Sequence, residues 1–399
     1  MKLWLTTILL ITACSPQLEQ AQQADLYMHS REARRDVLEA ALWQPELPYS
    51  ENLLNNYALE KGGWELLPKM TFGTAPVTLQ DVDSLVQGKS FTVGPGKHLG
   101  ADVPTNQADW ESLGQRVFFE LPMRYDNYLI WLLARPHLFE EVGLVADSAG
   151  QIPGLVKFKD HFGKSRVGMT CSLCHSADGQ IGRANRNLDL GLVRALYAEA
   201  QGIDGSVYRT WGPGRLDVSD DGVNGPTQIP DLFDLQDSNY LNHSGVIAVS
   251  GASTLAVRFE TQYILGHRML ARPARHLTWA LAQFVWNLKS SAEEPSPGNN
   301  EGRAVFQQNC GTCHDLTRGG AGDLVAAEQL TSDNTVAYTP ERGTGYYKVP
   351  SLRNARLNAP YLHDGSEATL ESLLKSGHPY GNTLESQKRA AVLNFLKQY

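Results

Sequence analysis

Cysteine is scarce in this chain, with five residues among 399. Four of them fall into two copies of one pentapeptide, Cys171-Ser-Leu-Cys174-His175 and Cys310-Gly-Thr-Cys313-His314. Cys-x-x-Cys-His is the attachment motif of c-type haem, in which both thiols bind the porphyrin and the histidine ligates the iron. A single copy is also compatible with a zinc or redox Cys-x-x-Cys. Two copies that use every cysteine but one predict two covalently bound haems, and they leave no thiol pair for a structural disulfide.

Long hydrophobic runs are also absent, apart from the segment from Leu3 to Ala13, which follows the positive charge of Lys2. This segment has the length of a signal-peptide core and is too short to span a bilayer. The sequence Ile11-Thr12-Ala13-Cys14 resembles the cleavage site of bacterial lipoproteins, in which the cysteine becomes the acylated first residue. We therefore expect a signal peptide over residues 1–13 and lipidation of Cys14. The expected location is the cell envelope, at the periplasmic face of the outer membrane; the alternative is an ordinary signal peptide.

Positive charge is in deficit. The chain has 35 lysines and arginines against 43 acidic residues, which gives a formal net charge of −8. No run of basic residues offsets this balance, so nucleic acid is excluded as the expected partner.

Helical periodicity is frequent, whereas strand signals are sparse. Apolar residues at helical spacing predict helices after Asp109, over Leu188–Leu196, over Leu277–Leu288 and near Val392. A stretch rich in proline, serine and glycine over residues 290–300 indicates a linker. The predicted fold class is mainly α, with two cytochrome c-type haem domains in tandem, long loops and an N-terminal extension. The expected boundaries are a tether and extension over 14–108, a first haem domain over 109–289, and a second haem domain over 301–399.

Three stretches resemble the bacterial di-haem cytochrome c peroxidase superfamily. They are Ser112-Leu-Gly-Gln-Arg-Val-Phe-Phe-Glu-Leu-Pro122, Trp211-Gly-Pro-Gly-Arg215 and Val349-Pro-Ser-Leu-Arg-Asn-Ala-Arg-Leu-Asn-Ala-Pro-Tyr-Leu-His-Asp-Gly-Ser366. The resemblance covers roughly residues 110–399, and the third stretch is the most specific. It implies a peroxidase-like oxidoreductase with Trp211 as an electron bridge between the haems. A buried structural tryptophan explains Trp211 equally well. Rubber oxygenases belong to the same superfamily, so the fold alone does not choose a reaction.

The chain departs from the peroxidases around its first haem motif. Those enzymes often carry a distal histidine soon after this motif, but no histidine occurs between His175 and His243. Where the family has a glutamine and a glutamate after its tryptophan, this chain has Asp221 and Asp231. We therefore expect an exchangeable distal position on the first haem, with Asp231 and then Asp221 as candidate proton carriers. His267 and Met269 are the candidate ligands from a remote segment, and packing residues are the alternative.

Methionine is absent after Met269, so the second domain contains no thioether to ligate its iron. Peroxidases of the superfamily typically use a methionine there. His378 falls close to that position, so we expect His314 and His378 as the iron ligands of the second haem. The alternative is a surface histidine in a turn. His363 is expected to be a structural hydrogen-bonding residue. Two histidines lower the potential relative to histidine and methionine, which suits electron relay.

Two further features have open interpretations. Arg215 is compatible with a haem propionate partner or with a surface salt bridge. The oxygen-rich loop of Asp217, Asp220, Asp221 and Asn224 is compatible with Ca2+ or with a solvated loop.

These observations predict an exported, peroxidase-like di-haem c-type cytochrome oxidoreductase. Its first haem is expected to react with a small-molecule oxidant, hydrogen peroxide in the first place. Its second haem is expected to relay electrons from a small redox protein. Two alternatives stay open, namely an electron-transfer cytochrome without a substrate site and a dioxygen-dependent oxygenase resembling rubber oxygenases.

Overall fold

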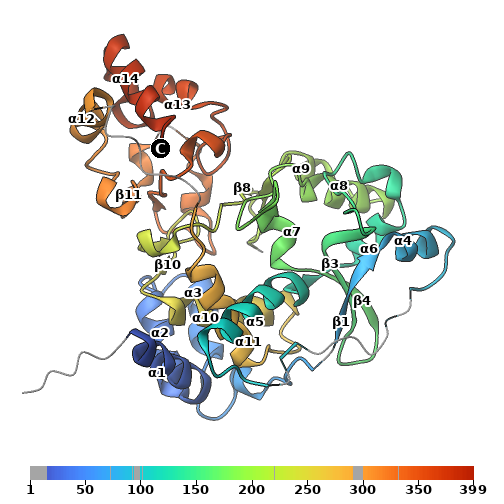
Figure 1. Cartoon of the computed structure of the whole chain (residues 1–399). Helices are drawn as coiled ribbons and strands as arrows, with labels where there is room; N and C mark the ends of the chain where they lie inside the picture. Colours follow the sequence, from blue (N-terminus) through green and yellow to red (C-terminus); the bar gives the residue numbers. More distant parts are fainter. Residues whose placement is uncertain are drawn as a thin grey trace, which may run out of the picture.

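The computed structural model describes residues 16–399 except 72, 92, 94–98, 101, 220, 291–299 and 331. The predicted signal peptide, Cys14 and most of the predicted linker therefore lie outside the described residues. Figure 1 shows three parts: a layer of helices, a lobe around a β-sheet, and a C-terminal unit. Among the described residues, no helix combines the length and the apolar character needed to cross a bilayer.

The helical layer joins the start of the chain to two later helices. It consists of α1 (Pro16–His29), α2 (Arg31–Ala41), α3 (Pro48–Asn56), the 3-10 turn η1 (Gly63–Leu66), α5 (Gln107–Glu120), α10 (Ala252–Gly266) and α11 (Arg275–Trp286). Their apolar side chains form one continuous core. Helix α11 lies at its centre, because eight of its twelve residues are buried. A helix that is apolar on most of its surface is stable only when other elements surround it.

The sheet lobe is built on four antiparallel strands in the order β1-β3-β4-β2. These are β1 (Thr74–Thr78), β2 (Arg124–Tyr125), β3 (Gln151–Lys159) and β4 (Ser165–Met169). The register pairs Val156 with both Pro76 and Gly168. Helices α4 (Leu79–Val86), α6 (Asn127–Leu133), α8 (Leu190–Ala200) and α9 (Ser206–Arg209), with η2 (Pro136–Leu138), complete this lobe. A second hydrophobic core fills it.

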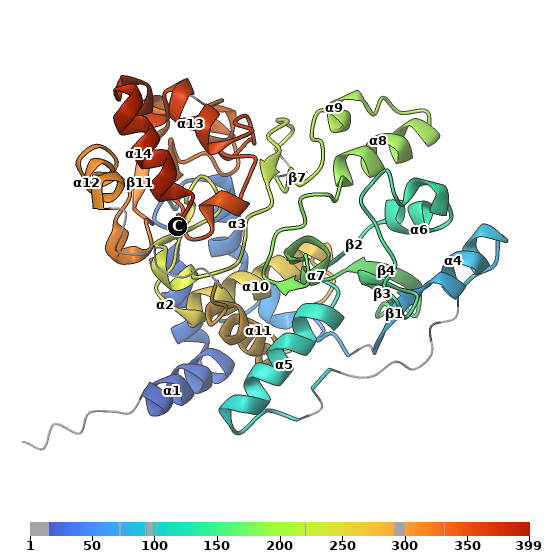
Figure 2. The same cartoon turned by 45° about the horizontal axis from the view of Figure 1, so that its top comes forward.

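Between these two parts lies α7 (Cys171–His175), which is the first haem motif (Figures 1 and 2). The chain then forms short two-stranded ladders, which lead toward the C-terminal unit. Their strands are β5 (Ser176–Ala177), β6 (Gln180–Ile181), β7 (Arg215–Leu216), β8 (Thr227–Gln228), β9 (Tyr240–Leu241) and β10 (Ile247–Ala248), with η3 (Leu235–Asp237).

The C-terminal unit has its own core, drawn from residues 305–399. Its main helices are α12 (Asn300–Asn309), α13 (Leu370–Ser376) and α14 (Ser386–Leu396). The strands β11 (Leu324–Ala326) and β12 (Tyr346–Lys348) pair in a hairpin. The 3-10 turns are η4 (Leu316–Arg318), η5 (Ala327–Gln329), η6 (Thr335–Tyr338), η7 (Ala355–Leu357) and η8 (His378–Thr383). The second haem motif directly follows α12.

Helices dominate the described chain, in agreement with the predicted class, but the four-stranded sheet was not predicted. Four expected helices appear as α5, α8, α11 and α14. For α5, the sequence indicated Asp109 as the N-cap, which is three residues too late. Asn106, not Asp109, caps α5, and its side chain accepts a hydrogen bond from the Asp109 backbone N–H. The domain boundaries stay predictions.

Candidate metal centres

The first haem motif is a single helical turn held against strand β3. Thr170 donates its backbone N–H to the carbonyl of Gly154 at 2.9 Å. Gly154 has φ +82°, and a Cβ at this position would overlap the backbone of Leu173. Only glycine allows the strand to approach the motif so closely. At the end of the turn, Asn185 donates its backbone N–H to the Cys174 carbonyl at 2.8 Å, which fixes the position of the second thiol.

The imidazole of His175 is oriented by a backbone carbonyl far along the chain. Its Nδ1 donates to the carbonyl oxygen of Pro230 at 3.0 Å. Histidines that ligate a metal usually donate their other ring N–H in this way, which leaves Nε2 as the free donor atom. Burial lowers the pKa of His175 to about 4, so the ring is neutral at pH 7, as a metal ligand must be.

The second motif repeats this arrangement within the C-terminal unit. His314 donates from Nδ1 to the carbonyl oxygen of Gly320 at 2.7 Å, so its Nε2 is also free. Burial lowers the pKa of His314 as well. Cys310 and Cys313 precede it at the end of α12, and His314 donates its backbone N–H to the Cys310 carbonyl at 2.9 Å. Both motifs therefore present two thiols and one aligned imidazole.

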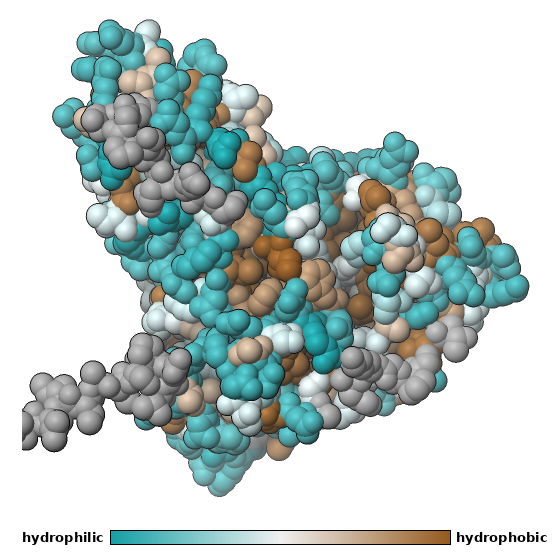
Figure 3. Space-filling model, in the orientation of Figure 1, coloured by the Kyte–Doolittle hydropathy of each residue, from teal (hydrophilic) through white to brown (hydrophobic). Residues whose placement is uncertain are grey.

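A cavity of about 320 Å³ opens beside the second motif. Cys310, Cys313, His314 and His378 all line it, together with apolar side chains such as Leu352. In Figure 3, hydrophobic side chains gather in the hollow between the C-terminal unit and the sheet lobe. An apolar cavity with a few convergent polar groups is typical of a cofactor site.

The residues of this cavity fit a haem with two histidine ligands. Helix α13 ends at Gly377, whose φ of +101° turns the chain so that His378 begins η8. The ring centroids of His314 and His378 lie 6.3 Å apart. A metal–imidazole nitrogen distance is about 2 Å and the ring centre lies about 1 Å further, so two axial imidazoles on one metal should be separated by about 6 Å. Burial lowers the pKa of His378 to about 4, with a smaller contribution from His314.

His363 lies in the same cavity but makes structural contacts. Its ring stacks on Tyr347 at a centroid distance of 4.3 Å, and its Nε2 lies 3.2 Å from the Tyr347 hydroxyl. The ring of His243 lies 6.4 Å from that of His363, but its Nε2 donates to the carbonyl of Gln228 at 2.9 Å. These contacts agree with the hydrogen-bonding role expected for His363.

One short segment, residues 228–231, connects the two motifs. Pro230 accepts the hydrogen bond of His175 and also lines the cavity of the second motif. The buried Gln228 side chain donates to the carbonyls of Pro360 and Leu362, both at 2.7 Å. Its backbone N–H donates to the carbonyl of His363 at 2.8 Å. The segment is therefore bonded to His175 on one side and to the wall of the second site on the other.

The structure places Asp231 in an ion pair. Its Oδ2 accepts from Arg183 Nη1 at 2.9 Å, and its Oδ1 accepts from the backbone N–H of Ala184 at 2.8 Å. Arg183 also donates to the carbonyl of Leu357 at 2.6 Å, across the contact with the C-terminal unit. Both carboxylate oxygens thus have partners. In the sequence, Asp231 directly follows Pro230, whose carbonyl orients His175. This environment suits a positioning residue better than the proton carrier that was expected.

Trp211 is buried at the corner of α8 and α9. Its indole N–H donates to Asn224 Oδ1 at 2.8 Å, its ring lies edge-on to Tyr208 at 5.5 Å, and Arg194 lies 5.1 Å from the ring centroid. These contacts fit the structural interpretation of Trp211. Asp221 lies in the neighbouring loop, and its Oδ2 is buried without a hydrogen-bond partner among the described residues.

The predicted Ca2+ loop is largely satisfied by its own chain. Asp217 accepts from the backbone N–H of Ser219 at 2.9 Å and of Gly225 at 3.0 Å. In the part of the chain that the structure describes, no group of three histidine, cysteine or acidic residues is arranged to hold a metal ion. Asp220 lies outside the described residues. The loop therefore lends no support to Ca2+ binding.

The remaining candidates act structurally. Arg215 donates to the carbonyl of Asp364 at 2.9 Å, which ties the ladder β7–β8 to the C-terminal unit. His267 donates from Nε2 to the carbonyl of Pro122 at 2.7 Å, and Met269 lies at the surface with 42% exposure. We infer that neither His267 nor Met269 is poised as a ligand. Sequence reasoning missed the contacts of His175 with Pro230 and of Gln228 with Pro360, because backbone carbonyls leave no signature in the sequence.

Comparisons with known proteins bear on the C-terminal unit. Residues 297–396 match the family described as cytochrome c oxidase, cbb3-type, subunit III. None of the curated proteins matches the chain. Among solved structures, it is similar to hydrazine synthase of Kuenenia stuttgartiensis, with 13% identity, a TM-score of 0.40, and coverage of 86% of this chain and 97% of that chain. It is also similar to a MauG-like protein associated with microbial copper homeostasis, with 17% identity, a TM-score of 0.38, and coverage of 75% and 90%.

The family match and the geometry of the second motif agree. Residues 297–396 contain Cys310, Cys313 and His314, and a cytochrome c family implies covalently bound haem c. The chain therefore carries a cytochrome c-type domain at its C-terminus.

Proposed function

We propose that the protein is a di-haem c-type cytochrome oxidoreductase with peroxidase-like activity. In this proposal the first haem, attached at Cys171 and Cys174, reacts with a peroxide. The second haem, attached at Cys310 and Cys313, relays electrons to it.

The observation that carries this proposal is the segment of residues 228–231. Pro230 both orients His175 and lines the cavity beside His314, so a few bonds separate the two centres. Electrons that enter at the second haem have a short bonded path to the first. This path runs through Gln228 and Pro230 and does not require Trp211 as a bridge.

A difference between the motifs supports separate roles. His314 has a second imidazole, His378, at the separation expected across one iron. For His175, the described residues provide no imidazole at such a distance, and His267 is hydrogen-bonded elsewhere. A haem held by both His314 and His378 would suit electron relay, whereas a haem held by His175 alone would be able to bind an oxidant.

The residues around the first motif can be given roles on this basis. A haem held by Cys171, Cys174 and His175 would supply the redox chemistry that cleaves a peroxide. His175 is held neutral and aligned by Pro230, and the ion pair of Asp231 with Arg183 fixes the adjacent backbone. Asp221, in the loop beside Trp211, stays the proposed proton carrier, because one of its carboxylate oxygens is buried and lacks a partner among the described residues.

The partners and the location belong to the same proposal. We propose a small redox protein as the electron donor and hydrogen peroxide as the oxidant. We also propose export, lipidation of Cys14 and attachment to the periplasmic face of the outer membrane. The amino-terminal sequence quoted above supports this location.

Ligand titration of the purified protein tests the proposal. Cyanide or carbon monoxide should shift the spectrum of one haem of the two. The shift should vanish when Cys171 and Cys174 are replaced by alanine, and it should persist when His378 is replaced by glutamine. Peroxide should then oxidise a reduced donor only in variants that keep the first haem. If neither haem binds cyanide or carbon monoxide, in the oxidised or in the half-reduced protein, the protein is better explained as an electron carrier.

The oxygenase alternative makes a different prediction in the same assay. A dioxygen-dependent enzyme would consume dioxygen in the presence of an unsaturated organic substrate and would show no peroxide turnover. No described contact favours this alternative, so the peroxidase-like function is preferred.

A further inference from the structure

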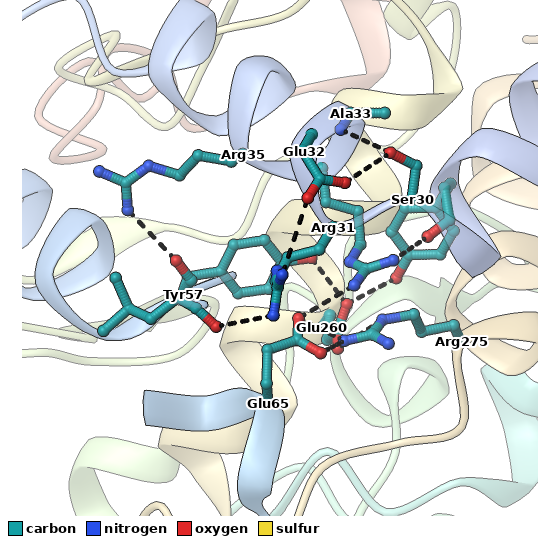
Figure 4. Close-up of polar contacts among 12 residues, drawn as sticks. Ser30, Arg31, Glu32, Ala33, Arg35, Tyr57, Glu65, Glu260 and Arg275 are labelled. Atoms are coloured by element: carbon teal, nitrogen blue, oxygen red, sulfur yellow. Dashed lines mark hydrogen bonds and ion pairs between the residues drawn. The ribbon is translucent and has the colours of Figure 1, made fainter. Parts of the chain in front are cut away.

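A buried cluster of two tyrosines and one glutamate joins the N-terminal helices to α10. Tyr57 donates its hydroxyl to Glu260 Oε2 at 2.8 Å, and Tyr27 donates to the same oxygen at 3.0 Å. All three side chains are at most 3% exposed. Figure 4 shows Tyr57, Glu260, Arg275 and Glu65 in this arrangement. We call Tyr27, Tyr57 and Glu260 the tyrosine cluster.

Ion pairs surround the tyrosine cluster. Arg275 lies 3.3 Å from Glu260 and donates to both oxygens of Glu65 at 2.7 Å. Arg34 pairs with Glu65 at 3.0 Å. Burial, followed by the charge of Glu260, raises the pKa of Tyr27 and of Tyr57 well above the usual value. The phenols therefore keep their protons at pH 7 and act as donors to the carboxylate.

Helix α10 connects the tyrosine cluster to the first haem motif. Tyr263 follows Glu260 by three residues, so the two side chains lie on one face of α10, with Cβ atoms about 5–6 Å apart. Tyr263 is 1% exposed and lies beside Cys171; burial first, and then the Cys171 thiol, raise the pKa of its phenol. On the other side, Trp279 stacks on Tyr27 at a centroid distance of 5.7 Å. Tyr263 thus lies beside Cys171 and one helical turn from Glu260, so α10 connects the tyrosine cluster to the first haem motif.

The stability of the fold does not by itself explain why two tyrosines and a glutamate are buried together with these ion pairs. A buried ion network is often no more stable than apolar residues of similar volume, because desolvation opposes the attraction between the charges. A phenol hydrogen-bonded to a carboxylate has a specific property, which is that it can lose an electron and a proton together. The carboxylate accepts the proton at hydrogen-bond distance, so no tyrosyl radical cation forms in the apolar core. Arg275 keeps its ion pair with Glu65 when Glu260 is neutralised.

We propose that the tyrosine cluster is an electron reserve for the first haem. When a peroxide oxidises this haem and no external donor is bound, one electron passes from Tyr57 or Tyr27 through Tyr263 to the haem. The phenolic O–H bond breaks, its proton moves to Glu260 Oε2, and a neutral tyrosyl radical and a carboxylic acid remain. Reduction of hydrogen peroxide to two waters consumes two electrons and two protons. The tyrosine would supply one electron and a haem held at Cys171, Cys174 and His175 would supply the other, while solvent supplies both protons.

This inference rests on the proposed function, since a peroxide that reacts at the first haem is the oxidant. It also gives the N-terminal extension a role, because Tyr27 and Tyr57 both belong to it.

Freeze-quench EPR of the full-length protein with both haems tests this inference. The protein is mixed with hydrogen peroxide in the absence of a donor, and the absorption spectrum of the haem is followed in parallel. The wild type should give a tyrosyl radical signal. The double variant Tyr27→Phe/Tyr57→Phe should lose it, and so should Glu260→Gln, which keeps both phenols. The matched control is Tyr49→Phe, because Tyr49 is equally buried but its ring faces Arg342 at 4.5 Å.

The outcomes separate the two proposals. A change in the haem spectrum without a tyrosyl radical, or an undiminished radical in the double variant, would overturn the electron reserve and leave the proposed function standing. No change in the haem spectrum would overturn both. Should Glu260→Gln fail to fold, as judged by circular dichroism and haem content, the single variant Tyr57→Phe decides. It should shift the radical entirely to Tyr27, which selective deuteration of tyrosine and the altered hyperfine pattern would detect.

Discussion

At the scale of single residues, the two motif histidines share one hydrogen-bonding arrangement. Each donates Nδ1 to a backbone carbonyl, Pro230 for His175 and Gly320 for His314, and thereby keeps Nε2 for a metal. The pentapeptides themselves were visible in the sequence, because covalent haem attachment requires fixed residue types. The absence of methionine from the second domain also pointed to His378, whose ring lies 6.3 Å from that of His314; its role as a ligand stays a prediction. The carbonyl partners were not predictable, because any residue type can provide a carbonyl and only the fold brings it close.

His378→Ala should remove the second ligand of the C-terminal haem. The iron then changes from low spin to high spin, while the haem content stays intact because both thioethers remain. EPR and pyridine-haemochrome assays measure these two quantities. His363→Ala is the matched control, since His363 contacts Tyr347. If His363→Ala produces the high-spin signal and His378→Ala does not, the assignment of the ligand is wrong.

His267 should make the stability of the protein depend on pH. Burial lowers its pKa to about 4, whereas an unfolded histidine has a pKa of about 6.5. As pH falls from 6.5 toward 4, the unfolded state therefore binds a proton that the folded state does not, and stability is lost by at most about 1.4 kcal/mol per pH unit.

The variant His267→Gln should be less stable than the wild type at pH 7 but should show a flatter profile between pH 6.5 and pH 4. Urea unfolding at several pH values measures this difference. Parallel profiles for the variant and the wild type would show that His267 does not carry the dependence.

At the scale of elements, helices were predicted better than strands. The apolar spacing of α11 and α14 is local information, and both helices appear where the sequence indicated them. Strand β3 contains Pro153 and Gly154, which are typical of a turn. Its partner β1 lies more than 70 residues earlier and pairs Thr74 with Phe158. The sheet therefore depends on long-range pairing and on the contact of Gly154 with the haem motif, neither of which has a local signature.

The contact between α5 and α11 should be sensitive to a single methyl group. A Cβ at Gly114 would overlap the carbonyl oxygen of Ala280 and lie 2.6 Å from Phe284 Cβ. Gly114→Ala should therefore push the helices apart and destabilise the protein by about 1–3 kcal/mol, although alanine favours helix formation. Thermal unfolding measures the loss. Gly251→Ala is the control, because a Cβ there would meet no atom within 4 Å and the backbone is extended. Equal effects of both substitutions would contradict the packing argument.

At the scale of the whole molecule, the N-terminal extension and the first haem motif share one core. Apolar residues of α1, α2 and α3 pack in the same cluster as those of α5, α10 and α11, and Cys171 packs against it. The C-terminal unit has a separate core and is joined through hydrogen bonds that include those of Gln228, Arg183 and Arg215. The linker expected over residues 290–300 falls at this division in the sequence, and the extension packs in the core that contacts Cys171.

Membrane attachment should depend on the thiol of Cys14. Cys14→Ser removes the thiol that would be acylated, so the variant should be recovered in the soluble fraction, whereas the wild type should fractionate with membranes. Mass spectrometry of the N-terminus should detect lipid only on the wild type. A wild-type protein with an unmodified N-terminus and no membrane association would contradict the lipoprotein prediction.

The position of Tyr263 beside Cys171 has a consequence for biogenesis. In the proposed export, the haem motif would be complete once residue 175 is translocated, whereas the helix that carries Tyr263 spans residues 252–266 and would emerge later. The maturation machinery therefore has a period in which the first motif is accessible. Once α10 docks, Tyr263 lies against Cys171 and leaves the thiol only partly accessible. Attachment during export, before release of the chain, is thus the expected order of events.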